Sequence, residues 1–110
     1  MAIKLDLTDF KKTLDKITSE QQIQMTVESE LKAAHIYFTK TIVSARNGVP
    51  DIIACVRGRF VAIELKRPGK DLSDLQRYNF DLIKRNGGQT YMINNLEDAS
   101  KIVPTIRGDL

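Results

Sequence analysis

Two carboxylates and an amine stand in this sequence at a spacing that could bind a divalent cation. They belong to Asp51, Glu64 and Lys66. Each lies at the edge of an apolar run, where a buried strand normally carries no charge, and like charges opposite each other destabilise a sheet. Mg²⁺ would remove that repulsion, because it is held by one or two carboxylates together with water and phosphate oxygens. The three residues therefore predict a metal-binding site.

The elements that must position these residues are two strands joined by a tight turn. Runs rich in Ile, Val and Phe flank Arg57-Gly58, which predicts a β-hairpin. A turn centred on Arg57-Gly58 places Asp51 opposite Glu64, and side chains alternate along a strand, so Lys66 falls on the same face as Glu64. An arginine is disfavoured where a turn needs a positive φ. A longer loop or a bulge, which would shift this register, therefore stays open.

This pattern resembles the signature of the PD-(D/E)XK nucleases, and the residues around it narrow the resemblance. Pro50-Asp51 is followed after twelve residues by Glu64-Leu65-Lys66. Over roughly residues 19–103 the chain is similar to the VRR-NUC branch of that superfamily, including its small stand-alone phage and bacterial members. The flanking residues that carry this similarity are Asn47-Gly48-Val49, Ala62-Ile63, Arg67-Pro68-Gly69, Ser73 to Gln76 and Gly87-Gly88.

The resemblance implies a metal-dependent nuclease and assigns roles to individual residues. Asp51, Glu64 and the backbone carbonyl of Leu65 would hold Mg²⁺ or Mn²⁺. Lys66 would orient the attacking water or stabilise the developing negative charge. Gln76 would lie beside this lysine. The same glutamine also completes a Ser-x-x-Gln capping box, which explains its presence without catalysis.

In the resembling family a glutamate on the first core helix completes the metal site. Glu20 is the best match for it in this chain. A helix that begins at Thr18 or Ser19 would equally explain Glu20 as an acid of the first turn, favoured by the helix dipole. Glu28 is a weaker substitute, and Gln24 stands where some relatives have the acid.

A net charge of +3 permits binding to nucleic acid without requiring it. Basic residues crowd around the predicted hairpin, and a solvated surface of mixed charge explains this distribution as well as DNA binding does. The single Cys55 excludes an intramolecular disulfide and a cysteine-based zinc site, and the single His35 excludes a multi-histidine metal site. We expect Cys55 to fill a strand position and His35 to lie at a helix end. In the nuclease interpretation five residues would contact phosphates: Arg46, Arg59, Arg67, Lys70 and Arg77.

The order of elements predicts a single α/β domain, with a restriction-endonuclease-like mixed sheet that has a central β-hairpin flanked by helices. We expect an N-terminal amphipathic helix in residues 1–18, a nuclease core in residues 19–103, and a loosely ordered tail in residues 104–110. The expected elements are a helix over 7–17, a second helix from 18 or 19 with Ile23, Val27 and Leu31 as its apolar stripe, a strand over 36–43, the hairpin, a helix over 73–86, a strand over 89–93 and a helix over 96–103.

Two classes of function follow. The first, which the resemblance implies, is a structure-selective endodeoxyribonuclease acting on branched DNA: small stand-alone members of the resembling family cut four-way (Holliday) junctions, and fused members act on flaps and ends, so flaps or linear DNA are the alternatives. The second is a nucleic-acid-binding module without turnover. We expect a homodimer, because the resemblance to small stand-alone family members implies one, and because specific DNA interfaces bury roughly 1,000–2,500 Å² of protein whereas one small domain offers little surface. No apolar run approaches about 18 residues and no signal peptide is visible, which predicts no membrane contact and a cytoplasmic location, in a bacterium or a phage-infected host cell.

Overall fold

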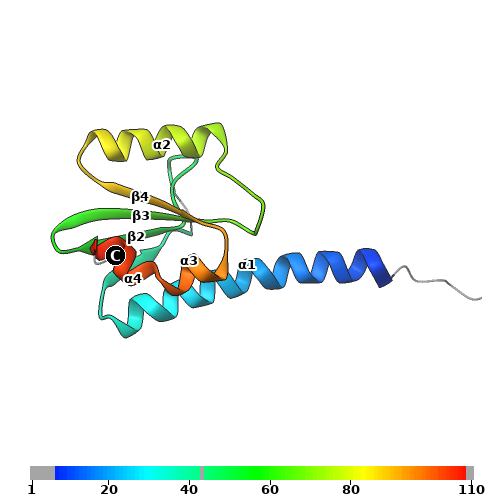
Figure 1. Cartoon of the computed structure of the whole chain (residues 1–110). Helices are drawn as coiled ribbons and strands as arrows, with labels where there is room; N and C mark the ends of the chain where they lie inside the picture. Colours follow the sequence, from blue (N-terminus) through cyan, green and yellow to red (C-terminus); the bar gives the residue numbers. More distant parts are fainter. Residues whose placement is uncertain (1–6, 43, 109–110) are drawn as a thin grey trace, which may run out of the picture.

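Four helices and four strands make up the part of the chain that the structure, a computed structural model, describes: residues 7–42 and 44–108. They form one compact α/β domain, which confirms the predicted fold class (Figure 1). In chain order the elements are α1 (Leu7–Ala33), β1 (Tyr37–Lys40), β2 (Ile52–Val56), β3 (Arg59–Leu65), α2 (Asp74–Arg85), β4 (Gln89–Ile93), α3 (Leu96–Ser100) and α4 (Ile102–Arg107).

The four strands form one mixed sheet in the order β1-β2-β3-β4. The first two pairings are antiparallel, and β3 pairs with β4 in parallel. A parallel pair needs a crossover connection, and α2 provides it between β3 and β4. The β2–β3 hairpin therefore occupies the two central positions of the sheet, as the sequence predicted.

The hairpin turn consists of two residues, Arg57 and Gly58. Val56 pairs with Arg59, so the predicted register is confirmed and no extra residue forms a bulge in the turn. Both turn residues have positive φ, 51° at Arg57 and 79° at Gly58, as a type I′ turn requires. This conformation costs a residue with a Cβ on the order of 1 kcal/mol. The Arg57 guanidinium donates a hydrogen bond of 3.2 Å to the Arg107 carbonyl, which holds the turn against α4.

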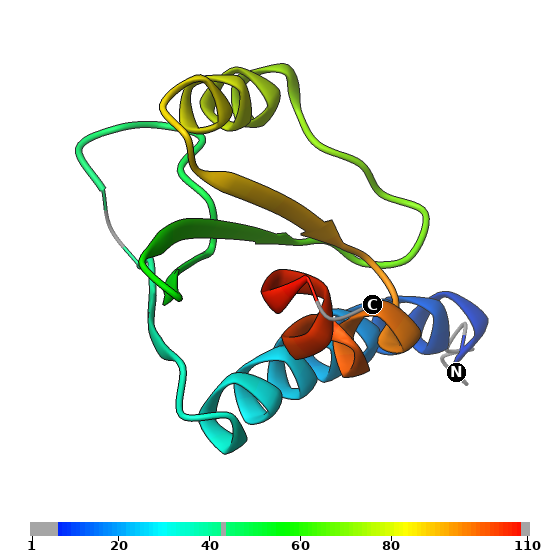
Figure 2. The ribbon, with the colours of Figure 1, turned by 60° about the vertical axis from the view of Figure 1, so that its left-hand side comes forward.

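Helices cover both faces of the sheet, and the main hydrophobic core lies on one side. Figure 2 shows α2 on one face and α1, α3 and α4 on the other. Ile52 and Ile63, which pair across the hairpin, point into the core on the α1 side and are fully buried. They pack with Ile23, Val27 and Leu31, the predicted stripe of α1. The opposite face of the hairpin is turned toward α2.

Helix α1 is one element, whereas the sequence predicted two. No glycine or proline interrupts residues 7–33, so the helix continues through Thr18 and Ser19, and neither residue begins a helix. The N-terminal half of α1 projects beyond the sheet and the other helices (Figure 1). Within the described chain, no helix is both long enough and apolar enough to cross a membrane. The strand expected over 36–43 is shorter, Tyr37–Lys40, and residue 43 lies outside the described residues.

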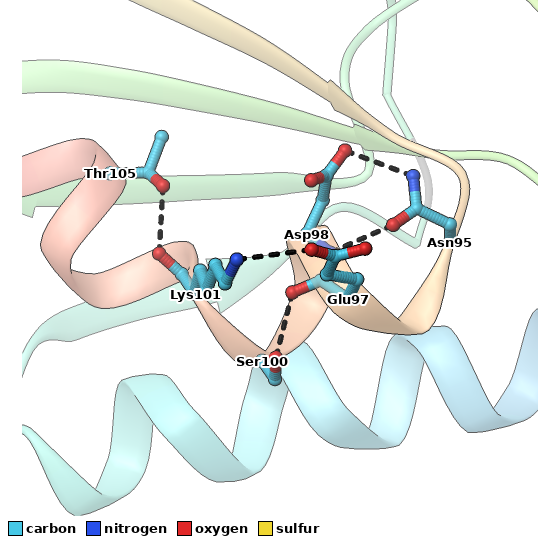
Figure 3. Close-up of polar contacts among 6 residues, drawn as sticks. All are labelled: Asn95, Glu97, Asp98, Ser100, Lys101 and Thr105. Carbon is cyan, nitrogen blue, oxygen red and sulfur yellow. Dashed lines mark hydrogen bonds and ion pairs between the residues drawn. The ribbon is translucent and has the colours of Figure 1, made fainter. Parts of the chain in front are cut away.

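The prediction of one last helix and a loose tail is wrong for residues 96–108. Two short helices occupy this stretch, and Ile106 is fully buried in the core. Pro104 stands in the first turn of α4, where a backbone N–H has no helical partner, so it does not break the helix. Figure 3 shows the local polar contacts of these two helices, including the Asn95 cap at the start of α3 and the hydrogen bond of 2.8 Å from Thr105 Oγ1 to the Lys101 carbonyl in α4. Residues 109–110 lie outside the described part.

Candidate active site

Asp51 is placed by the loop that leads into β2. Its Oδ2 atom accepts a hydrogen bond of 2.9 Å from the backbone N–H of Leu65 on the neighbouring strand. Its own carbonyl accepts one of 2.8 Å from the N–H of Thr41. The aspartate is therefore tied to both neighbouring chain segments. Its carboxylate lies at the end of the hairpin where Glu64 and Leu65 close β3.

Glu64 is buried although it is an acid, with 4% of its surface exposed. It alternates with Ile63 and Leu65 on β3, so its side chain points to the α2 face of the sheet while theirs point into the core. Its Oε1 atom accepts a hydrogen bond of 3.3 Å from Gln76 Nε2. Its Oε2 atom has no hydrogen-bond partner among the described residues. A buried carboxylate oxygen without a partner is costly unless another group binds it.

The environment favours the protonated form of this acid. Burial, followed by the adjacent Asp51 carboxylate, raises the pKa of Glu64 from 4.5 to about 8. The positive charge of Lys66 acts in the opposite direction and lowers the pKa of Glu64. The fold thus holds two carboxylates together at a cost that only a proton or a cation would relieve.

Gln76 forms the predicted capping box, and its side chain also contacts Glu64. Its backbone N–H donates to Ser73 Oγ at 3.2 Å, and its Oε1 atom accepts from the Ser73 N–H at 2.8 Å, which completes the capping box at the start of α2. The same side-chain amide turns its Nε2 group toward Glu64. The capping box therefore fixes the orientation in which Gln76 reaches the buried carboxylate.

Lys66 follows directly after β3. Its backbone N–H donates to the Ile93 carbonyl at 2.9 Å and so extends the pairing with β4 by one residue. It stands two positions after Glu64, and its charge is close enough to lower the pKa of that acid. The structure thus brings Asp51, Glu64, Gln76 and Lys66 to the same end of the central hairpin.

Glu20 lies on α1, which covers the face of the sheet opposite α2. It lines a cavity of about 250 Å³ together with Gln24, Asp51 and Leu65. The helix begins at Leu7, so Glu20 is not an acid of its first turn and the helix dipole does not explain it. Among the described residues, no three His, Cys, Asp or Glu side chains lie close enough together to hold a metal. Glu20 therefore shares the cavity with Asp51 but does not complete a three-acid cluster.

Glu28, the weaker candidate, has partners that explain it without a metal. Its Oε1 atom lies 3.4 Å from Lys40 Nζ, and its Oε2 atom accepts from Gln24 Nε2 at 3.1 Å. The ion pair joins α1 to β1, one helical turn after Gln24. The amide at position 24 is thus oriented toward Glu28.

Of the five residues predicted to contact phosphates, four lie in the segments that adjoin Asp51, Lys66 or Gln76, and the fifth, Arg59, lies elsewhere. Arg67 and Lys70 flank a turn directly after Lys66, where the Lys70 N–H donates to the Arg67 carbonyl at 3.1 Å. Arg77 is near the start of α2, and its guanidinium pairs with Asp71 at 2.8 Å, which lowers the pKa of that aspartate. Arg46 precedes Asp51 in the loop. Arg59 is different, because it begins β3 at the turn end, roughly 16 Å along the strand from Glu64.

Sequence reasoning missed Asn79. This residue of α2 is buried, with 6% of its surface exposed, and its amide bonds to Arg46, to the Asn47 carbonyl and to the Leu75 carbonyl. Asn79 stands three residues after Gln76, on the helix face turned to the sheet. A polar residue in that otherwise apolar stripe was the signal available in the sequence.

Cys55 and His35 lie away from these residues, at the turn end of the sheet. Cys55 is exposed on β2, and His35 follows α1 with a φ of 56°, the helix-end position that the sequence predicted. Both line a cavity of about 360 Å³ with Arg57 and Arg107.

The chemistry of the carboxylate pair fits a hard divalent cation. Asp51 and Glu64 would supply oxygen ligands, the Glu64 Oε2 atom has no hydrogen-bond partner among the described residues, and the Leu65 backbone carbonyl follows Glu64 directly in the chain. Mg²⁺ and Mn²⁺ favour such oxygen ligands and keep several positions for water and phosphate. Two such acids with a neighbouring lysine are suited to chemistry on a phosphate ester.

The mixed sheet, the central hairpin and the acidic pair at its open end together define a nuclease-type α/β domain. A family model described as the VRR-NUC domain matches residues 7–95. The chain therefore belongs to the VRR-NUC family, and the match includes α1 from its first residue.

Comparison with solved structures gives the same fold. A structure described as a VRR-NUC domain superposes with a TM-score of 0.68 at 17% sequence identity, covering 77% of this chain and 94% of that chain. At this identity the likeness supports the fold alone. Comparison with curated proteins finds no match.

Proposed function

We propose that this domain is a divalent-metal-dependent endodeoxyribonuclease, which hydrolyses phosphodiester bonds in DNA. The observation that carries the proposal is the buried Glu64 carboxylate, held beside Asp51 with one oxygen that no described residue bonds. A fold gains no stability from this arrangement, whereas a cation bridging both acids to a phosphate would use it.

Asp51, Glu64 and the Leu65 carbonyl would hold Mg²⁺ or Mn²⁺, with Glu20 as a further ligand reached across the shared cavity. The bound ion would polarise the scissile phosphate and lower the pKa of a bound water. The Asp51 carboxylate is kept in place by the Leu65 N–H, and the Glu64 carboxylate by the Gln76 amide. These bonds would keep both acids in place when substrate binds.

Lys66 would act on the reacting phosphate. Its positive charge is close enough to Glu64 to lower the pKa of that acid, and there it would orient the attacking water or stabilise the negative charge that develops on the phosphate. Arg46, Arg67 and Lys70 would hold the DNA backbone through phosphate contacts. Arg77 would join them by exchanging its partner Asp71 for a phosphate. Arg59 would contact only a distant part of a longer substrate.

We further propose a homodimer that cuts four-way junctions. The N-terminal half of α1 projects from the domain, and Phe10 in that segment is 65% exposed (Figure 1). In the sequence Leu7, Phe10, Leu14 and Ile17 follow helical spacing, and such a stripe gains stability by packing on a partner. Two subunits related by a two-fold axis present two active sites, which matches the symmetry of a junction.

The test of the activity is cleavage of a labelled panel of junction, flap, nicked, linear and single-stranded DNA, with and without Mg²⁺ or Mn²⁺. We expect metal-dependent cleavage that is fastest on the junction and produces paired cuts. Equal cleavage of linear and branched DNA would reject the junction preference. Binding without cleavage under every metal condition would favour a nucleic-acid-binding module. In such a module Glu20 would not join Asp51 and Glu64 in binding a metal, and no cluster of three such acids is found among the described residues.

The test of the dimer is the mass in solution, where a monomer has 12.5 kDa. Phe10→Glu should convert the dimer to a monomer, because it places a charge in the proposed interface. Met25→Glu is the matched control, since Met25 is 68% exposed on the part of the same helix that packs on the domain. A monomeric wild type, or equal effects of both substitutions, would contradict this interface.

A further inference from the structure

Helix α2 carries two inward-facing amides, and each one reaches a different segment of the proposed active site. Gln76 bonds to Glu64 on β3. Asn79 lies three residues later and bonds to the loop before Asp51. Glu64 and Asn79 are the buried polar residues of the described chain, which makes both of them expensive for the fold to retain.

Both polar atoms of the Asn79 side-chain amide make hydrogen bonds. Its Nδ2 group donates to the Asn47 carbonyl at 3.1 Å and to the Leu75 carbonyl at 2.9 Å, and its Oδ1 atom accepts from Arg46 Nε at 2.9 Å. Two of these bonds cross 32 and 33 positions of sequence to reach the loop. A residue retained only to fill this space would be apolar, like its neighbours in the stripe.

The loop is also pressed closely onto α2. Gly48 has a φ of 74°, and a Cβ placed on it would lie 2.8 Å from Leu75 Cγ and 2.9 Å from Asn79 Nδ2. Any other residue at position 48 would push the loop away from the helix. Three residues later the same loop delivers Asp51, so the position of that carboxylate depends on how the loop sits on α2.

Arg46 is presented by the same contact. Arg46 Nε donates a hydrogen bond to Asn79 Oδ1, while the terminal Nη nitrogens of Arg46 make no hydrogen bond or ion pair with any described residue. Arg46 is an exposed residue of the loop that leads to Asp51. A guanidinium anchored through Nε keeps its Nη edge for a second ligand, and a phosphate is the ligand that such an edge recognises.

We infer that Asn79 is a positioning residue, which aims Arg46 at a DNA phosphate and fixes the loop that carries Asp51. This inference rests on the proposed nuclease function and deepens it. It separates two effects of one side chain: the bond to Arg46 serves substrate binding, and the bond to the Asn47 carbonyl serves turnover through the placement of Asp51.

The experiment is a double-mutant cycle of Asn79→Ala and Arg46→Ala, with affinity for a short labelled DNA duplex measured in chelator over a range of salt concentrations. Each single variant should bind about tenfold more weakly, as expected for loss of one charged hydrogen bond. Each should lower the salt slope by about 1. The double variant should bind no more weakly than Arg46→Ala, because Asn79 acts on binding through that arginine.

Turnover supplies the second measurement. At saturating DNA with Mg²⁺, Asn79→Ala should reduce the rate about tenfold because the Asp51 loop is released, whereas Arg46→Ala should raise KM alone. Asn86→Ala is the matched control, since Asn86 makes the same kind of bond to a carbonyl four residues earlier on α2, at 2.8 Å, with no bond to the loop. It should change neither affinity nor turnover. Asn79→Leu fills the side-chain volume, so it serves if the alanine variant fails to fold.

The outcomes are distinguishable from failure of the proposed function. Additive losses of affinity in the cycle would overturn the link between Asn79 and Arg46. Unchanged turnover in Asn79→Ala and Asn79→Leu, with a cleaving wild type, would overturn the role of the loop. A wild type that binds but never cleaves would reject the nuclease proposal, while non-additive binding in the cycle would still support Asn79 as the residue that positions Arg46.

Discussion

Two polar clusters in this domain differ in every respect that separates a structural contact from a functional one. On α3 and α4 the hydrogen bonds and the ion pair drawn in Figure 3 join residues no more than four positions apart, and the side chains lie at the surface. At the open end of the hairpin, Asp51 is bonded to the Leu65 N–H 14 positions away and Glu64 to Gln76 12 positions away. One oxygen of Glu64 has no hydrogen-bond partner among the described residues, and the pKa of this acid is strongly raised.

The difference shows what each cluster is for. Local bonds at a helix end form as soon as the helix forms, and each contributes a few tenths of a kcal/mol to about 1 kcal/mol. A buried pair of like charges destabilises the fold that contains it, so such a pair persists where a ligand gives it a use. The α3–α4 cluster therefore has a structural role, whereas the charges of the hairpin cluster are unfavourable for folding and indicate a functional one.

The largest expected effect comes from removing an acid of the hairpin cluster. Glu64→Ala and Asp51→Asn should each reduce metal-dependent cleavage by about 1,000-fold or more, because each removes a ligand and the charge that holds the cation. Asp98→Asn, in the α3–α4 cluster, should leave cleavage unchanged. Thermal unfolding gives the companion measurement: Mn²⁺ should stabilise wild type and fail to stabilise either hairpin variant. If both variants still cut, the metal site lies elsewhere.

Lys66 sharpens the comparison within the hairpin end itself. Lys66→Ala should lower turnover roughly 30- to 100-fold at little cost in DNA affinity, because its charge acts on the transition state. Arg67→Ala and Lys70→Ala should instead weaken binding and lower the salt slope by about 1 each, since phosphate contacts act through counterion release. Single-turnover rates at saturating DNA separate the two effects. A Lys66→Ala protein with weak binding and a normal saturated rate would reverse the assignment.

Much of the fold followed from local sequence patterns. The hairpin, its register and its turn were predictable because they depend on short local patterns: apolar residues rich in Ile, Val and Phe in both strands, and the dipeptide Arg57-Gly58 in the turn. The division of α1 into two helices was wrong, since a capping pattern begins a helix only where the preceding backbone is not already helical. The order at the C-terminus was also missed. Ile102 and Ile106 have helical spacing, but residues 104–110 were predicted to be a loosely ordered tail.

The candidate site was predictable to the extent that it depends on register. Asp51 and Glu64 come together because paired strands fix their positions. Asn79 could not be found in this way, because its partners lie more than 30 positions away and only the packing of the loop on α2 brings them together. Arg59 was grouped with the other basic residues by its closeness in sequence, whereas the strand carries it to the far end of the hairpin.

The metal-free protein should show the cost of the acidic pair as a dependence of stability on pH. The folded-state pKa of Glu64, about 8, lies above its ordinary value of 4.5, so the folded state binds a proton more tightly than the unfolded state does. The associated stability is present below pH 4.5 and is lost as the pH rises toward 8, at no more than about 1.4 kcal/mol per pH unit.

Urea unfolding in chelator at several pH values measures this slope. Glu64→Gln should abolish it, and Glu97→Gln, an exposed acid of the α3–α4 cluster, should preserve it. A wild-type stability that stays level or rises across this pH range would contradict the raised pKa of Glu64, and with it the view that the hairpin end stores unfavourable charge.

The smallest expected effect is in the α3–α4 cluster. Glu97 Oε1 and Lys101 Nζ lie 3.1 Å apart on an exposed helix surface, and 77% and 54% of these side chains are accessible to solvent. Water and salt screen such a pair, so a double-mutant cycle of Glu97→Ala and Lys101→Ala should give a coupling of about 0.5 kcal/mol or less, decreasing further at high salt. A coupling of several kcal/mol would mean that an exposed local pair can contribute as much as a buried one. The contrast with the hairpin end would then rest on the long-range contacts and the raised pKa of Glu64 alone.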